Sequence, residues 1–230
     1  MAMIQSNETD IYKTIKQAIL QQKLRPNMQL VEDVIAESFG VSRTPVRNVL
    51  RRLAYEKLVT IIPHKGTFVS CPAVTEAKEV FEMRRVLEAA AIRKACKLAE
   101  EEHLDRLRAL IEEEHEAHAQ GDMFGVLQIS GDFHLKIAEI AGNSYYLRYL
   151  EELISLTYVI IAFYGYKQLM YCSSDEHTQI LEAIRLKDEA AAEQLIVQHL
   201  TLIEQSLDFA EAENLPSSLV DIFKEVRSPS

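Results

Sequence analysis

The sequence predicts a mainly α-helical protein with two parts, an N-terminal winged helix-turn-helix domain over residues 1–72 and a C-terminal all-α antiparallel helical bundle over residues 73–230. Three observations predict this fold class. Two short helical segments meet at a Gly-led turn, two β-rich segments follow them, and beyond Pro72 the apolar residues recur only at helical spacing. A chain of 230 residues is long enough for each part to bury its own core.

The first short helix is predicted by apolar residues at helical spacing, namely Val31, Val34, Ile35 and Phe39. Gly40 follows them and can adopt the left-handed conformation that ends many helices. A second helix is expected to begin at Pro45, whose missing N–H is no loss at a helix start, with Thr44 as the capping residue. Its apolar stripe consists of Val46, Leu50 and Leu53.

The polar side of this second helix carries groups that suit DNA. Arg47 and Arg51 lie four residues apart and therefore share a face away from the apolar stripe. Arginine makes bidentate contacts with guanine edges and phosphates, and hydroxyl groups near a helix start suit phosphate oxygens. The predicted DNA-binding residues are Ser42, Arg43, Thr44, Arg47 and Arg51. The alternative is that these arginines, with Arg52, only solvate a helix face.

Two β-rich segments, residues 58–62 and 67–69, follow the second helix. The segment between them reads Pro63-His64-Lys65-Gly66, which predicts a hairpin with a basic tip. We interpret this hairpin as the wing of the domain. His64, Lys65 and Gly66 are expected to contact the minor groove or the DNA backbone.

Charge is divided between the two parts of the chain. Residues 1–72 carry 10 Lys and Arg against 6 Asp and Glu, a net charge of +4. The rest carries 15 against 29, a net charge of −14, within a total of −10. Because nucleic-acid binding depends on a local positive surface, the acidic total does not exclude double-stranded DNA as a partner of the N-terminal part.

Cysteine usage and hydropathy indicate a cytoplasmic protein. Cys71, Cys96 and Cys172 are widely spaced and form no CxxC pair, so neither a disulfide framework nor a thiolate zinc site is expected. The sequence has no basic-then-apolar leader and no run of about 18 apolar residues, so we expect neither export nor a membrane span.

Beyond Thr75 the sequence predicts six helices. Apolar stripes mark the first two of them, Val80, Met83, Leu87 and Ala90 in one and Leu104, Leu107 and Ile111 in the next. Breaks are expected near residues 99–101, 120–121, 142–143, 172–173 and 187–188. Each break is too short to be an interdomain linker, which predicts one compact domain joined to the first through residues 71–74.

Three histidines of the bundle, His134, His177 and His199, fall on apolar helix faces. A buried imidazole is costly unless its nitrogens are satisfied, and a shared metal ion would satisfy all three through nitrogen ligation. The alternative is three independent core histidines, each hydrogen-bonded to a neighbour. The spacing alone does not decide whether the three converge.

The N-terminal part resembles the GntR family of bacterial transcription regulators, through VSRTPVRNVLRRLAYEKLV at residues 41–59 and PHKGTFV at residues 63–69. The C-terminal part resembles the all-helical FCD effector domain of the FadR-type branch. The matching segments are FEMRRVLE at 81–88, DFHLKIAEIAGN at 132–143, DEHTQILEAI at 175–184 and QHL at 198–200.

The resemblance implies a ligand-responsive transcription regulator, by default a repressor, that binds a palindromic operator as a homodimer. In many FCD domains a carboxylate and three histidines hold a divalent metal, and a small organic acid binds beside or onto it. The histidines correspond to His134, His177 and His199. Arg84 and Arg85 lie where relatives often place an effector-contacting arginine, although either could instead pair with Glu88 or face solvent.

One metal ligand of the family is replaced in this chain. The family's aspartate precedes the first histidine by four residues, where this sequence has Ser130. Asp132 is rotated by about 200° from His134 along a helix and so faces away from it. Loss of the anionic oxygen favours Zn²⁺ or Ni²⁺ over Mn²⁺ or Mg²⁺, with water or the effector completing the shell. Ser130, Arg84 and Arg85 are the predicted effector-binding residues.

Parts of the sequence are also compatible with three other functions. The first is a metal-free pocket in which the histidines hydrogen-bond the effector directly. The second is a zinc-dependent hydrolytic enzyme, which three histidines and an open position would suit. The sequence has no HExxH motif, and Glu176 beside His177 should point elsewhere, so we do not expect an enzyme. The third is an architectural DNA binder with a purely dimerising body, which the inward histidines disfavour.

Overall fold

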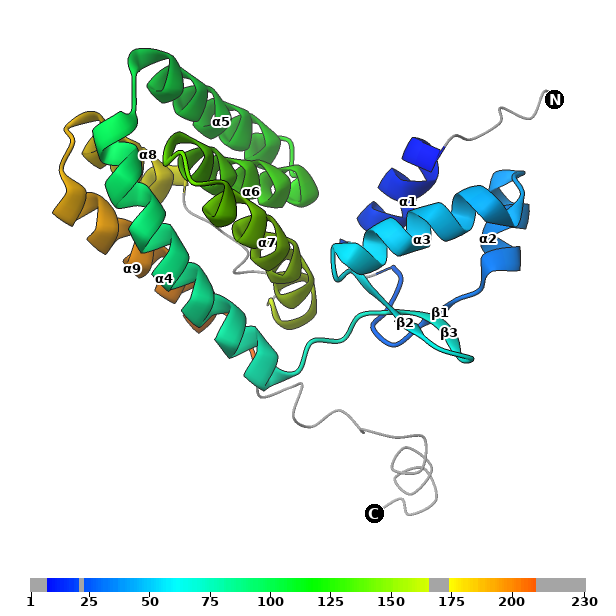
Figure 1. Ribbon diagram of the computed structural model, residues 1–230. Coiled ribbons are helices and arrows are strands. Elements are labelled where there is room, and N and C mark those ends of the chain that lie inside the picture. The colour runs from blue at the N-terminus through cyan, green and yellow to red at the C-terminus, as the bar shows by residue number, and fades with distance from the viewer. Residues whose placement is uncertain (1–7, 21–22, 166–173, 210–230) are drawn as a thin grey trace.

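The computed structural model describes residues 8–20, 23–165 and 174–209. The elements are α1 (Glu8–Leu20), β1 (Gln29–Leu30), α2 (Glu32–Phe39), α3 (Arg43–Tyr55), β2 (Val59–Ile62), β3 (Gly66–Val69), α4 (Val74–Leu98), α5 (Glu101–Ala119), α6 (Met123–Ile140), α7 (Ser144–Tyr164), α8 (Ser174–Arg185) and α9 (Glu189–Gln205). Figure 1 shows a small domain with the three strands beside a larger helical body. The predicted fold class, mainly α with a winged helix-turn-helix and a helical bundle, is confirmed.

The turn between α2 and α3 differs from the prediction at the start of α3. Gly40 ends α2 with φ 65°, as predicted, and its N–H reaches the carbonyls of Ala36 and Glu37. The helix α3 begins at Arg43, two residues before Pro45, and Ser42 is its extended N-cap without a side-chain cap bond. Thr44 therefore does not cap the helix. Pro45 is tolerated at the third helical position because the N–H groups of the whole first turn lack helical acceptors.

The packing of α3 was predicted correctly, and that of α2 was predicted correctly for Ile35 and Phe39, which pack against the apolar cluster. Val46, Leu50 and Leu53 of α3 are all buried. In α2, Val34 is 60% exposed and Val31 precedes the helix, whereas Ala36 is the buried residue. The helix has eight residues and contacts α3, and its packed face consists of Ile35, Ala36 and Phe39.

The wing forms as predicted, with one additional strand. Strands β2 and β3 pair antiparallel from Val59 with Val69 to Ile62 with Gly66, and His64 turns the hairpin with φ 62°. Strand β1 pairs with the other side of β3, giving the order β1-β3-β2. Because β1 has two residues, it carries no alternating pattern that sequence reasoning could detect. Nε2 of Gln29 donates to the Lys65 carbonyl at 2.9 Å and holds the wing tip.

The body consists of the six helices α4 to α9, and four of the five predicted breaks coincide with the observed ones. The fifth break, at residues 172–173, and Cys172 lie outside the described residues. Leu104, Leu107 and Ile111 are buried, as predicted. The predicted stripe of α4 is wrong in part, because Met83 is 48% exposed while Phe81 and Arg84 are buried. Within the described ranges, no helix combines the length and apolar character needed to cross a membrane.

The small domain packs against α7 of the body (Figure 1). Ile11 and Ile15 of α1 belong to the same apolar cluster as Ile154 and Tyr158 of α7. Residues 70–73 connect β3 to α4, and the Tyr164 hydroxyl donates to the carbonyl of Pro72 at 2.5 Å. The helical body and the small domain therefore share a continuous packed interface.

Candidate functional site

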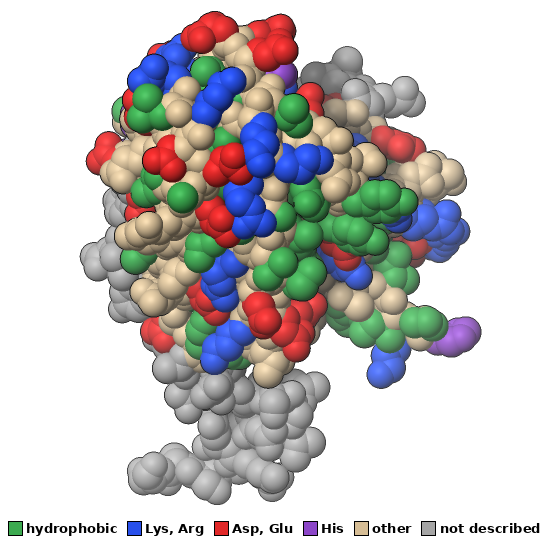
Figure 2. Space-filling view, turned by 60° about the vertical axis from the view of Figure 1, so that its left-hand side comes forward, with side chains coloured by type: hydrophobic (Ala, Val, Ile, Leu, Met, Phe, Trp, Pro, Cys, Tyr) green, Lys and Arg blue, Asp and Glu red, His purple; other side chains and the backbone are tan. Residues whose placement is uncertain are grey.

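The residues predicted to bind DNA lie on one exposed part of the small domain. Ser42, Arg43, Thr44, Arg47 and Arg51 are exposed at the start and on the outer face of α3, and His64, Lys65 and Gly66 are exposed at the wing tip. In contrast, Figure 2 shows acidic and basic side chains interspersed over the face of the body that it presents. The exposed basic groups of α3 and the wing thus form a surface that suits a DNA duplex.

Two of these arginines are paired with acids of α2. Arg43 pairs with Asp33, and Nε of Arg47 lies 2.8 Å from a carboxylate oxygen of Glu32. Both pairs are solvent-exposed, and exposed ion pairs contribute only about 0–1 kcal/mol. The arginines can therefore exchange their carboxylate partners for phosphates or base edges at small cost.

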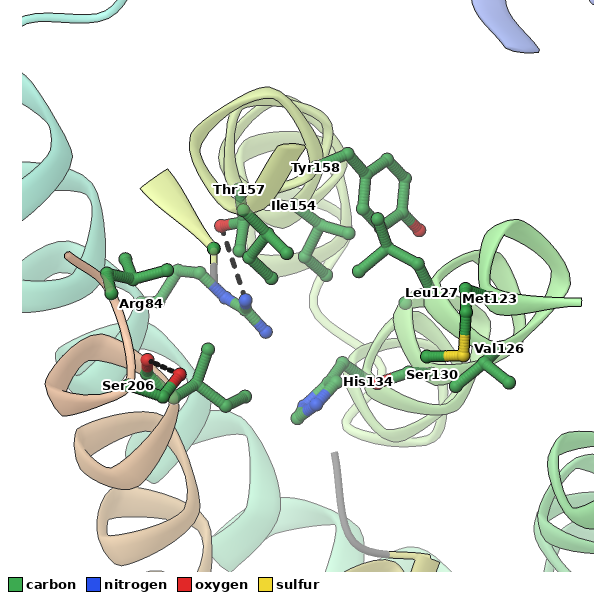
Figure 3. A pocket seen from close by; sticks show the side chains of 15 residues that line it. Arg84, Met123, Val126, Leu127, Ser130, His134, Ile154, Thr157, Tyr158 and Ser206 are labelled. Carbon is green, nitrogen blue, oxygen red and sulfur yellow. Dashed lines mark hydrogen bonds between the residues drawn. The ribbon is translucent and has the colours of Figure 1, made fainter. Parts of the chain in front are cut away.

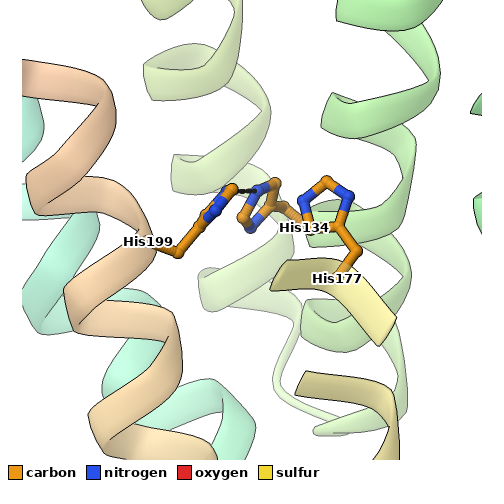
Figure 4. Close-up of side chains that lie close together, drawn as sticks. All are labelled: His134, His177 and His199. Atoms are coloured by element: carbon orange, nitrogen blue, oxygen red, sulfur yellow. Dashed lines mark hydrogen bonds between the residues drawn. The ribbon is translucent and has the colours of Figure 1, made fainter. Parts of the chain in front are cut away.

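The three inward histidines converge inside the body (Figure 4). His134 of α6, His177 of α8 and His199 of α9 are each at most 2% exposed. Nε2 of His134 lies 3.2 Å from Nε2 of His199. One nitrogen of each ring lies within 4.8 Å of the others. The three helices thus place three nitrogen donors around one point.

Each of these imidazoles contacts a carboxylate through its other nitrogen. The Nδ1 contacts are His134 with Glu88 at 2.5 Å, His177 with Glu114 at 2.8 Å and His199 with Glu176 at 2.6 Å. A carboxylate only accepts hydrogen bonds, so Nδ1 is the nitrogen that carries the hydrogen, and Nε2 keeps a lone pair. This carboxylate–histidine arrangement is typical of histidines that ligate metals.

The electrostatics of the cluster fit a bound cation. Burial lowers the pKa of His134 to about 4, although Glu88 opposes this, so the ring is neutral at physiological pH. Burial would raise the pKa of Glu88, but Arg84 and His134 together lower it to about 2. Two Nε2 lone pairs that face each other repel unless a positive group lies between them. Ligand distances of 2.0–2.1 Å around a tetrahedral zinc ion place nitrogens about 3.3 Å apart, close to the observed 3.2 Å.

A cavity of about 50 Å³ adjoins His134 between α4, α6, α7 and α9 (Figure 3). Arg84 of α4 is 3% exposed and points into it. Its Nε donates to Glu88 at 2.7 Å and its Nη1 donates to Thr157 at 3.3 Å. Its Nη2 is buried and has no hydrogen-bond partner within the described part of the chain. A buried guanidinium N–H that faces a cavity is well placed to bind a carboxylate.

Glu88 connects the cavity to the histidine cluster. One of its oxygens accepts from Arg84, and the other lies 2.5 Å from Nδ1 of His134. Glu88 therefore holds both Arg84, which faces the cavity, and His134, which is a candidate metal ligand. The importance of Glu88, Glu114 and Glu176 was not apparent from the sequence, because acids are frequent throughout these helices. Glu176 does point away from His177, and it reaches His199 on the neighbouring helix.

The other residues predicted at this site have distinct positions. Ser130 is buried, lines the cavity and lies one helical turn before His134. Asp132 is exposed and lines a separate hollow beside the small domain. Arg85 does not line the cavity and instead pairs with Glu204 of α9 at 2.5 Å. Of the two arginines, the cavity therefore includes Arg84 and not Arg85.

Comparison with known families identifies both parts of the chain. The model described as "FCD domain" matches residues 79–202, and the model described as "Bacterial regulatory proteins, gntR family" matches residues 7–69. The HTH-type transcriptional repressor RspR of Escherichia coli (strain K12) is 23% identical over 89% of this chain and 90% of that protein. The Nta operon transcriptional regulator of Aminobacter aminovorans is 29% identical over 73% of this chain and 80% of that protein.

Solved structures show the same fold. The structure of McbR/YncC from E. coli superimposes with a TM-score of 0.68 at 21% sequence identity, covering 87% of this chain and 98% of that one. At this level of sequence identity, the similarity shows that the two proteins share a fold.

Proposed function

Because the chain belongs to the GntR family of bacterial regulatory proteins and carries an FCD domain, we propose that it is a repressor whose affinity for its operator changes when a small organic acid binds beside a three-histidine metal site. The family establishes a DNA-binding transcriptional regulator and not an enzyme. Repression, the acid and the metal are the proposed parts. The observation that carries the acid is the unpartnered Nη2 of Arg84, which faces a cavity shared with His134, and the metal is supported by the convergence of the three histidines.

His134, His177 and His199 would hold the metal through their Nε2 atoms, and Glu88, Glu114 and Glu176 would orient the three rings. Three imidazole nitrogens and no ligating carboxylate among them favour Zn²⁺ or Ni²⁺ over Mn²⁺ or Mg²⁺. When bound, the ion would supply positive charge and open coordination positions beside the cavity.

Arg84 would anchor the carboxylate of the effector. Its Nε and Nη1 are held by Glu88 and Thr157, so the third nitrogen is fixed in direction before any ligand arrives. A preorganised donor loses little conformational entropy on binding. Ser130 lies on the same cavity wall as His134 and would contact the effector from α6.

The repressor would bind DNA as a homodimer. Two copies of α3 related by a twofold axis would enter successive major grooves of a palindromic operator. Arg43, Arg47 and Arg51 would contact bases and phosphates with Ser42 and Thr44, and the wing residues His64, Lys65 and Gly66 would contact the backbone or minor groove.

The test is operator binding in the presence of organic acids. A double-stranded site is first selected from random DNA with zinc-loaded protein, and its affinity is then followed by fluorescence anisotropy as acids are added. We expect at least one small acid to weaken operator binding by the unmodified protein and by Arg85→Lys, but not by Arg84→Lys. The neighbouring Arg85 is a matched control because it lies outside the cavity. An operator affinity that responds to no acid would contradict the proposal.

A further inference from the structure

We propose that two copies of this chain associate through the outer face of α4, with the two α4 helices antiparallel about a twofold axis that passes beside Val86. This inference rests on the proposed function, which requires a homodimer, and it specifies the surface and the orientation. The outer face of α4 consists of Glu79, Met83, Val86, Ala90 and Lys94.

These five residues lie on one side of the helix. They are three or four residues apart along the sequence, which is the spacing of a helix–helix seam. The opposite side of α4 is buried in the body and includes Phe81, Arg84 and Glu88. In Figure 1, α4 runs along the outside of the helical body. The outer face is therefore accessible to a second chain.

The middle of this face is apolar. Val86 is 61% exposed, and Met83, one turn earlier, is 48% exposed. Exposed apolar side chains that adjoin one another between charged residues mark protein–protein contact sites. In the antiparallel pair, Met83 would lie against Ala90 of the partner subunit. A large side chain would thus face a small one, which lets the two helices approach closely.

The two ends of the face carry opposite charges. Glu79 lies near the start of α4 and Lys94 near its end, about 22 Å apart along the axis, so they cannot pair within one chain. Neither forms an ion pair with another described residue. The bases beside Lys94 differ in this respect, because Arg93 and Lys97 pair with Glu193 and Glu189 of α9.

This charge distribution selects the antiparallel orientation. With the twofold axis between positions 86 and 87, Glu79 would face Lys94 of the partner subunit, and the symmetry would form this pair twice. A parallel arrangement would instead place Glu79 against its own copy and Lys94 against its own copy. Like charges that meet across an interface are unfavourable, so the parallel arrangement is disfavoured.

Tyrosines of α7 extend the outer face. Nζ of Lys94 lies 5.8 Å from the centre of the Tyr146 ring, and Arg84 donates to Thr157, so α4 and α7 run antiparallel. Tyr149 therefore lies one turn closer to the middle of α4 than Tyr146 does, and its side chain is exposed. Tyrosine is enriched in protein–protein interfaces.

The position of this interface connects it to both sites of the protein. The inner side of α4 carries Arg84 and Glu88, and residues 70–73 join the start of α4 to strand β3 of the small domain. A shift of α4 when the cavity is filled would therefore change the distance between the two α3 helices of the dimer. Shifts of helices at subunit interfaces are a common basis of such switching.

Sedimentation velocity of the full chain over a range of concentrations tests the surface. Val86→Glu would place two carboxylates together at the axis, and we expect its dimer dissociation constant to rise at least about 100-fold. Glutamate forms helices at least as well as valine, so the exposed substitution preserves the fold, which circular dichroism checks. Leu186→Glu is the matched control, because Leu186 is equally exposed at 61% and lies between α8 and α9. It should leave the dimer intact.

A charge exchange tests the orientation. Glu79→Lys and Lys94→Glu each turn two attractive pairs into repulsive ones, so each variant should weaken the dimer about tenfold. The double variant restores both pairs with reversed polarity and should dimerise within about twofold of the unmodified protein. A double variant that is weaker than either single variant would overturn the antiparallel arrangement.

The inference and the proposed function fail in different ways. If the unmodified protein and Val86→Glu dimerise equally well, another surface forms the dimer, so this inference is wrong and the proposed homodimer stands. If the unmodified protein sediments as a monomer at all concentrations, with and without operator DNA, both are wrong.

Discussion

The hydroxyl group of Tyr158 lies directly against the backbone of Gly131, so closely that a Cβ atom at position 131 would overlap the hydroxyl oxygen. Gly131 follows Ser130 on α6, and Tyr158 lines both the cavity beside Arg84 and the hollow between the body and the small domain. On the far side of that hollow, Nζ of Lys16 lies 5.9 Å from the centre of the Tyr158 ring. These residues connect the cavity wall to α1 by direct contact.

Gly131→Ala should destabilise the protein. The added methyl group has no room between α6 and α7, and overpacking of this kind typically costs about 1–3 kcal/mol. Urea unfolding followed by circular dichroism measures the change. Adding Tyr158→Phe to Gly131→Ala should restore part of the loss, because it removes the nearest overlapping atom. A double variant no more stable than Gly131→Ala alone would argue against this contact.

Lys16→Met should weaken the effect of the acid on operator binding. Lys16 of α1 lies over the Tyr158 ring and pairs at 3.0 Å with Glu56, the residue that ends α3. The variant keeps the apolar part of the side chain and loses the ammonium group, which contacts both Tyr158 of α7 and Glu56 at the end of α3. We expect the acid-dependent change in operator affinity, measured by anisotropy, to fall by roughly 1 kcal/mol. Lys13→Met, an exposed site on the same helix, should leave that change intact.

Glu32→Gln should tighten operator binding. In the free protein Glu32 pairs with Arg47, and removing its charge frees the guanidinium and reduces repulsion from phosphates. We expect a gain of roughly threefold, whereas Arg47→Ala should cost about 1–3 kcal/mol. Glu37→Gln, an exposed position on the same helix, serves as the control for the loss of one negative charge. Equal effects of the two glutamate variants would indicate that the pair with Arg47 is irrelevant.

Ser130→Asp should change which metal the protein prefers. Ser130 is buried one turn before His134 on the same cavity wall, where an added carboxylate oxygen would favour harder ions. Competition dialysis should show manganese affinity rising by at least about tenfold relative to zinc. Ser130→Asn has nearly the same volume without the charge and should not produce this shift.

The sequence predicted the inward histidines more reliably than their partners. His134, His177 and His199 stand among aliphatic residues at helical spacing, which indicates a buried face. The carboxylates that contact them lie on helices rich in acids, so their roles depend on how the helices cross. Crossing geometry follows from side-chain packing across the whole bundle and is not recorded in any local pattern.

The first body helix shows why residue spacing alone does not distinguish the buried Arg84 from Arg85. Its buried face includes Phe81, Arg84 and Glu88, and the last two form an ion pair inside the protein. Apolar spacing does not detect a buried face that carries charged residues. For this reason the spacing predicts Met83, which is exposed, as part of the buried stripe. Adjacent residues on a helix differ by about 100°, so a small error in the assigned face exchanges Arg84 for Arg85.

The central claim is that three histidines from three helices share one metal ion, and the metal content of purified, chelator-free protein tests it most directly. We predict nearly one equivalent of zinc or nickel per chain, retained in His115→Ala, whose side chain is exposed, and lost in both His134→Ala and His177→Ala. A protein that binds no metal even after incubation with excess zinc would contradict the account.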